Sequence, residues 1–381
     1  ALSLRKDAIR IAKDADDEIK RERFRSVLQG VPFGAKDLFA VEGRVTTWGA
    51  KPFAAQVSSS TATALRKLEK ERSVLIGKLA MIELAGGPSY SAATASLTGP
   101  CLNPWNREYW AGGSSSGSGA AVAAGLVPFA LGTETSGSII TPAAFCGITG
   151  LRPTFGLVSR NGAMALSPSL DKVGPMCRTA EDCGHVLAVL AGGDHEDPGS
   201  AGKNFYYAPQ FARPFHQLKV GYSPAEFDGA EENARPALRA ALDVVRSFGV
   251  QLVEKELPKL PYNDTVFTLI SAEAGHEFRE LIESGKVEEL ADQQQIEGLK
   301  KSLGVSAADY LKARDAQREI TEAFSKLLYE VDVYLSPSRM GAANSAHQPF
   351  AQQQSKSGRS SIIAASNAAG VPALSVPCGF A

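Results

Sequence analysis

The spacing of hydrophobic and polar positions predicts alternating helices and strands in the first third of the chain. Residues 3–29 mix charged and aliphatic side chains at helical spacing, and residues 61–71 repeat this amphipathic pattern. The apolar run 73–77 is typical of a buried strand, and so is 127–131. Just before the second strand, the Gly- and Ala-rich segment 117–124 predicts a helix small enough to pack closely under a sheet.

The rest of the chain is richer in helical patterns. We expect a loop at 199–217, strands at 218–222 and 331–335, and helices at 236–248, 265–303 and 307–329. The polar character of 265–303 predicts a peripheral helical layer. No linker or repeat divides the chain. The pattern therefore indicates one large domain over 1–381 of the α/β (α+β) class, with a large mixed central sheet covered by helices. Residues 200–330 would form a peripheral, mostly helical region on the substrate side.

Composition and charge narrow the classes of function. A formal net charge of −1 over 381 residues gives no reason to expect binding to nucleic acid or to an anionic membrane. Five cysteines without a Cys-x-x-Cys pair argue against a zinc site or disulfide framework and favour a reducing, cytoplasmic compartment. The longest apolar run, 120–131, is too short to span a bilayer, and no signal peptide opens the chain. The chain begins without Met and stops just after the strand-like segment 373–378, so we expect both ends to be trimmed.

Two loops dense in Gly and Ser carry the candidate chemistry. The first is Gly112–Gly119, and the second is Gly132–Ser138. Glycine lets a backbone approach a ligand closely. A serine hydroxyl is a weak nucleophile until another group removes its proton. The loops therefore raise the question of which residue acts as the base.

Several interpretations of the first loop compete. Gly113 to Gly117 fits the Gly-x-Ser-x-Gly elbow of α/β-hydrolases, which would make Ser115 the nucleophile, but none of the five histidines has a motif-like setting. A phosphate-binding P-loop is excluded because no Gly-Lys-Ser/Thr follows the glycines, and a dinucleotide fingerprint lacks its third glycine. A flexible loop without a catalytic role is the plainest alternative. The charged run 194–197 is typical of an exposed loop rather than of a metal site.

Taken together with Lys36, the two loops resemble the amidase signature family. The family's first pattern is Gly-Gly-Ser-Ser-Gly-Gly-Ser, and residues 112–118 read Gly-Gly-Ser-Ser-Ser-Gly-Ser. The second pattern is Gly-Thr-Asp-x-Gly-Gly-Ser-Ile, and residues 132–139 read Gly-Thr-Glu-Thr-Ser-Gly-Ser-Ile. Further similar segments are 30–37, 46–47, 142–154, 169–176, 332–338 and 367–377. The resemblance covers nearly the whole chain, is strongest over 30–180 and rests on several long motifs in the right order.

The resemblance implies a Ser–Ser–Lys triad. Ser138 would be the nucleophile, Ser114 the proton bridge and Lys36 the base. It also implies a cis peptide bond between Gly113 and Ser114, and a hydrogen bond by which Ser115 holds the lysine.

The same resemblance implies an oxyanion hole. Backbone N–H groups of Thr135, Ser136, Gly137 and Ser138 would stabilise the tetrahedral oxyanion. The family usually has Gly where Ser136 stands and Asp where Glu134 stands. The side chain of Ser136 narrows the loop, and Glu134 is longer than the usual Asp. Both differences affect the geometry of the loop, but neither removes a catalytic group.

The chemistry of such a triad depends on the charge of the lysine. An unperturbed lysine has a pKa of roughly 10.4 and is protonated at neutral pH. Burial beside Phe33 and Ala35 would disfavour the ammonium and lower the pKa of Lys36. A neutral Lys36 could then draw a proton from Ser138 through a bridging hydroxyl, without a histidine, metal or cofactor. Asp37 is expected to be structural, because a carboxylate close to the lysine would raise its pKa.

The substrate is less constrained than the chemistry. Family members that take carboxylate-bearing substrates can place an Arg two or three residues after the nucleophile, where this chain has Ile140 and Thr141. We therefore expect a neutral, apolar acyl or aryl carboxamide. The candidate walls of its pocket are Met81, Leu84, Ile140, Thr141 and Phe145.

Other interpretations stay open. Within the family, the chain could be a glutamine amidase like the one in the glutaminyl/asparaginyl-tRNA amidotransferase, which works with a partner subunit. It could also cleave allophanate, a carbamate (urethane) or an ester by the same acyl-enzyme chemistry. A non-catalytic binding protein on the same fold is an alternative of another class. The expected partners are a small-molecule amide and, at most, a second copy of the chain in a homodimer.

Overall fold

The computed structural model describes residues 2–353 and 361–380. Its main sheet contains both parallel and antiparallel strand pairs. Within the described residues it has seven strands in the order β1-β3-β2-β4-β6-β5-β10. In that order the strands are Leu2–Ser3, Val74–Leu79, Pro32–Lys36, Phe129–Glu134, Lys172–Cys177, Thr149–Arg152 and Ala373–Ser375. β2 runs parallel to β3 and β4, and the other neighbours are antiparallel. The sequence prediction of a large mixed sheet is confirmed.

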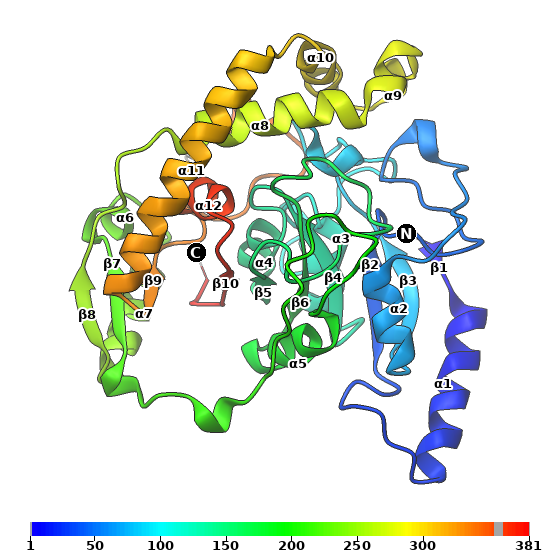
Figure 1. Ribbon diagram of the computed structural model, residues 1–381, viewed down its shortest axis with the longest axis horizontal. Helices are drawn as coiled ribbons and strands as arrows, with labels where there is room; N and C mark the ends of the chain where they lie inside the picture. The colour runs from blue at the N-terminus through cyan, green and yellow to red at the C-terminus, as the bar shows by residue number, and fades with distance from the viewer. Residues whose placement is uncertain (1, 354–360, 381) are drawn as a thin grey trace.

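Short helices surround this sheet (Figure 1). They are α1 Arg5–Lys20, α2 Thr63–Lys70, α3 Ser116–Ala123, α4 Ile140–Cys146 and α5 Ala180–Leu190. The amphipathic and Gly/Ala-rich patterns placed α2 and α3 to within two residues. The first helix is shorter than predicted, because the chain turns at Glu22 with φ 59° and Arg25 folds back to Glu18 at 2.7 Å.

A second, smaller sheet was not predicted. It consists of the parallel strands β8 Gln251–Glu254, β7 Lys219–Tyr222 and β9 Val333–Leu335 in that order. The helices α6 Pro224–Asp228 and α7 Arg235–Ser247 accompany it. Figure 1 shows this sheet apart from the main one. The sequence predicted strands at 218–222 and 331–335, but it placed them in the single central sheet.

A helical layer spans the two sheets. It contains α8 Tyr262–Glu277, α9 Arg279–Glu283, α10 Gln293–Ser302, α11 Ala307–Glu330 and α12 Ser361–Ala368. α8 contacts α10, α11 and α12, so Leu269 and Ala274 are fully buried. This helix is therefore less peripheral than its polar pattern predicted. Among the described residues, no helix is long and apolar enough to cross a membrane.

The parallel pairing of β2 with β4 positions the two segments that carry the candidate chemistry. Phe33 and Phe129 stack with ring centroids 5.1 Å apart, which aligns the two strands in the core. Both strands end at the same edge of the sheet. Lys36 closes β2 and Glu134 closes β4, so the lysine lies beside the start of the second serine loop.

Candidate active site

Lys36 and Ser114 meet in the interior of the protein. The Lys36 Nζ donates hydrogen bonds to Ser114 Oγ at 2.7 Å and to Thr133 Oγ1 at 2.9 Å. Lys36 is fully buried and Ser114 nearly so. A side chain held on two hydroxyls at the end of a core strand has little freedom to move away from them.

The environment of Lys36 favours its neutral form. Burial lowers the pKa of Lys36 to about 7, although the carboxylates of Asp171 and Glu134 raise it in part. Near neutral pH a large fraction of Lys36 is therefore unprotonated and able to accept a proton.

Asp37 faces away from this lysine. Its carboxylate pairs with the buried Lys78 at 2.8 Å and accepts hydrogen bonds from the N–H and the hydroxyl of Thr47. The expectation that Asp37 is structural is confirmed.

The first serine loop approaches its neighbours closely. The peptide bond between Gly113 and Ser114 is cis, as the resemblance implied. A Cβ added to Gly113 would lie 2.6 Å from the Trp110 ring and 2.9 Å from Ile82 Cγ1, so only glycine fits there. The loop then enters α3, where Ser116 begins the helix.

Ser115 supports the lysine differently from the way the resemblance implied. Its hydroxyl donates to the Thr133 carbonyl at 3.1 Å and accepts from the Thr133 N–H at 3.3 Å. The expected direct bond from Ser115 to Lys36 is therefore corrected: the Ser115 side chain lies along the backbone of β4, and the Thr133 hydroxyl contacts the lysine in its place.

Ser138 lies on the second loop, just before α4. It is partly exposed and lines a cavity of 480 Å³ together with Gly113, Thr135, Ser136 and Thr141. Its carbonyl accepts the N–H of Ser115 at 3.2 Å, which joins the two serine loops. The structure thus brings the three proposed triad residues to one place, with Ser138 on the cavity side and Lys36 on the buried side.

The backbone of the second loop has free donors. Within the described part of the chain, no hydrogen bond uses the N–H groups of Ser136, Gly137 or Ser138. Gly137 has φ 92°, a conformation that a side chain would strain, and an added Cβ would lie 3.2 Å from Ile363 and Thr141. Donors without a partner beside Ser138 are what an oxyanion hole requires.

Glu134 anchors this loop, a role that sequence reasoning missed. One oxygen accepts the N–H groups of Ile139 and Ile140 at 2.8 and 2.9 Å. The other accepts from Arg152 and from Asn367, both at 2.8 Å. Although burial opposes its ionisation, the Arg152 charge and these hydrogen bonds lower the pKa of Glu134 to about 2.

A second carboxylate supports the loop from the residue just before β6. Asp171 accepts the hydroxyl of Thr135 at 2.6 Å and the N–H groups of Leu166 and Ser167 at 2.8 and 2.9 Å. The matching motifs contain Glu134, Arg152 and Asp171. The sequence separations of these three residues do not indicate that their side chains meet around the second serine loop.

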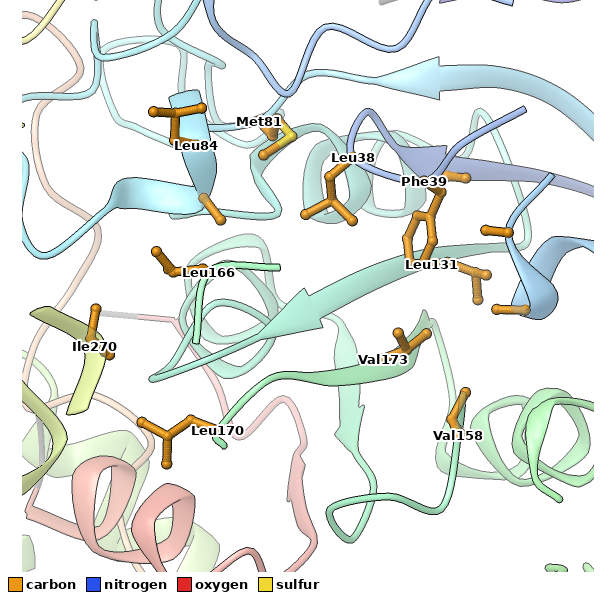
Figure 2. Packing of buried hydrophobic residues seen from close by; sticks show 14 of the residues in the cluster. Leu38, Phe39, Met81, Leu84, Leu131, Val158, Leu166, Leu170, Val173 and Ile270 are labelled. Carbon is orange, nitrogen blue, oxygen red and sulfur yellow. The ribbon is translucent and has the colours of Figure 1, made fainter. Parts of the chain in front are cut away.

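The tentative pocket walls are corrected in part. Thr141 lines the cavity, whereas Met81 and Leu84 do not and are buried in the main hydrophobic cluster. Figure 2 shows Met81 and Leu84 within this packing. Ile140 is buried at the start of α4 and is also absent from the cavity wall, and Phe145 is buried against Trp110 with ring centroids 6.4 Å apart. Ile140 and Phe145 are buried because that face of α4 points into the core.

Comparisons with known proteins identify the family of the chain. The family model described as Amidase matches residues 1–381. The chain belongs to the amidase family. It is accordingly a hydrolase of carbon–nitrogen bonds in non-peptide amides.

Individual relatives span most of the chain. A glutamyl-tRNA(Gln) amidotransferase subunit from Chromohalobacter salexigens is 37% identical, over 97% of this chain and 80% of its own length. The native peptide amidase of Stenotrophomonas maltophilia is 29% identical with a TM-score of 0.83, over 100% of this chain and 82% of its own. A vestigial protein complex related to the origins of an s-triazine catabolic enzyme contains a chain that is 26% identical with a TM-score of 0.87, over 98% of this chain and 82% of its own.

Proposed function

We propose that this amidase cleaves carboxamides through an acyl-enzyme formed on Ser138. Lys36 in its neutral form accepts a proton through the Ser114 hydroxyl, and the Ser138 oxygen attacks the amide carbonyl. The proton returns by the same path to the leaving nitrogen, so that ammonia or an amine departs as a neutral molecule. Water then attacks the ester, and the acid leaves.

The observation that supports this proposal most is the 2.7 Å hydrogen bond between the buried Lys36 and Ser114, beside a nucleophile that lines a cavity. The free N–H groups of residues 136–138 would stabilise the tetrahedral oxyanion. Loss of one such donor typically costs about 3–4 kcal/mol of the activation barrier.

Glutamine is the first candidate substrate. The relative from Chromohalobacter salexigens, at 37% identity, is named as one subunit of glutamyl-tRNA(Gln) amidotransferase, and that name places it within an assembly. By analogy, we propose that this chain releases ammonia from a side-chain carboxamide and that a partner subunit would use the ammonia.

A neutral carboxamide is the second candidate. Apolar and aromatic side chains form one part of the cavity wall, among them Leu166, Phe267, Ile270 and Phe350. The similarity to the Stenotrophomonas maltophilia peptide amidase also favours a carboxamide substrate other than glutamine. This candidate predicts turnover of aryl and alkyl amides without any partner.

Ammonia release separates these outcomes. The purified chain is incubated with L-glutamine, L-asparagine, benzamide and hexanamide, and a coupled enzymatic assay measures ammonia. We expect turnover of at least one amide, and a loss of about 10³-fold or more in Ser138→Ala. Ser325→Ala, on an exposed turn of α11, is the matched control and should keep full activity. Equal activity of Ser138→Ala and the control would refute the proposal.

A further inference from the structure

The cavity in front of Ser138 contains a charged side chain. Of the described residues that line it, Arg339 alone carries a charge, and the others are apolar, aromatic, or neutral and polar. Arg339 follows β9 in the segment 336–339 and so reaches the cavity from 201 positions beyond the nucleophile. A cation that lines a cavity beside a nucleophilic serine is a natural partner for a substrate anion.

The guanidinium of Arg339 stacks on the aromatic ring of Phe145. Its Cζ lies 5.2 Å from the centroid of the Phe145 ring. That ring packs edge-on against Trp110, which itself lines the cavity. Stacking uses the face of the guanidinium, whereas its N–H donors lie in its plane. The contact with Phe145 therefore involves the face of the Arg339 guanidinium and orients its plane.

We propose that Arg339 determines specificity by binding a carboxylate of the substrate, so that the enzyme acts on carboxamides that also carry an acid group. This inference rests on the proposed function of Ser138. It decides against the second candidate, a neutral carboxamide, and against the sequence expectation that was drawn from Ile140 and Thr141 standing where an Arg could follow the nucleophile. A guanidinium can hold a carboxylate through two parallel hydrogen bonds, which fix the distance from the acid group to the scissile amide.

A matched pair of amides tests the inference. One is glutarate monoamide, and the other is pentanamide, in which a methyl group replaces the carboxylate. We expect the wild type to favour the acid by about 10- to 100-fold in kcat/KM, the usual range for a hydrogen-bonded charge. Arg339→Gln should remove this preference by raising KM for the acid with little change in kcat, because the contact is the same in the ground and transition states. Pentanamide should be affected less than about threefold, a change small beside the expected preference.

Controls separate recognition from folding. Arg246→Gln, on the exposed face of α7, should leave both reactions unchanged. Arg339→Lys keeps the charge without the planar fork and should retain part of the preference. Thermal melting of each variant shows whether the loss of the contact with Phe145 unfolds the protein. Should Arg339→Gln fail to fold, the partial loss in Arg339→Lys decides the question.

A binding measurement makes the test independent of turnover. Titration calorimetry on Ser138→Ala should show tighter binding of the monoamide than of pentanamide, and the added Arg339→Gln change should abolish the difference. Absence of any ammonia release by the wild type would refute the proposed function, yet the calorimetric preference would still decide the role of Arg339. A wild type that does not discriminate, or an equal loss on both amides in a folded Arg339→Gln, would overturn the inference.

Discussion

The behaviour of Lys36 depends on a balance between burial and charge. Desolvation of a fully buried ammonium outweighs the two carboxylates, Asp171 and Glu134, and lowers the pKa of Lys36 to about 7. Two hydroxyls accept its hydrogen bonds in place of a carboxylate. Asp37, the next residue in sequence, instead forms an ion pair with Lys78 of the neighbouring strand β3. The local arrangement therefore keeps the base usable at neutral pH.

The pH dependence of amide cleavage should report this lysine. Below pH 7 the protonated Lys36 cannot accept a proton, so kcat/KM should fall about tenfold per pH unit on the acid side. Lys36→Met should lose roughly 10²- to 10⁴-fold in rate, the usual contribution of a general base. Lys300→Met, on the surface of α10, is the control. A wild-type profile that is flat from pH 8 to pH 5 would contradict the assignment.

At the scale of elements, one carboxylate holds the loop that carries Ser138, the proposed nucleophile. Glu134 ends β4, accepts the first N–H groups of α4 and pairs with the fully buried Arg152 of β5. It also accepts from Asn367 of α12. Four elements therefore meet on one side chain, and the position of Ser138 depends on all of them.

Glu134→Gln tests this anchor. The substitution keeps the size of the side chain but leaves the Arg152 charge buried without its counter-charge, which typically costs about 3–5 kcal/mol. Urea denaturation should show that loss in the free energy of unfolding, and ammonia release should fall because the loop is no longer held. Glu283→Gln on exposed α9 should change neither quantity. Equal stability of the two variants would show that Glu134 is not an anchor.

At the scale of the whole molecule, the two sheets differ in their hydrophobic support. The main sheet packs on an extended cluster that includes Phe33, Phe129 and Leu131. The small sheet has a separate buried cluster of Tyr222, Phe227 and Leu242. Fewer buried apolar contacts mean a lower free energy of local opening. We therefore expect the small sheet to open locally more easily than the main sheet.

Hydrogen exchange followed by mass spectrometry should resolve this difference. We expect peptides that cover β7, β8 and α7 to exchange at least tenfold faster than peptides that cover β4 and β6, a difference of local stability that native proteins commonly show. The buried helix α8 serves as an internal reference of high protection. Equal protection of the two sheets would contradict the view that their stabilities differ.

Sequence patterns predicted the parts of this molecule that depend on local periodicity or on long motifs. They placed α2, α3, α7 and α11, and the motifs selected Lys36, Ser114 and Ser138. They did not predict the small sheet, because β7, β8 and β9 are short and pair across long sequence separations. Of the predicted pocket walls, Thr141 lines the cavity, whereas Ile140 does not, because which face of α4 points inward depends on packing. Arg339 was not predicted, because it reaches the cavity only through the tertiary fold.

The central claim, that Ser138 is the nucleophile, is tested most directly by covalent labelling. The protein is treated with a serine-directed fluorophosphonate, digested and mapped by mass spectrometry. We predict a single adduct on Ser138, which disappears in Ser138→Ala and forms more slowly in Lys36→Met because the hydroxyl is no longer activated. An adduct on Ser115 or Ser114, or undiminished labelling of Ser138→Ala, would contradict the account.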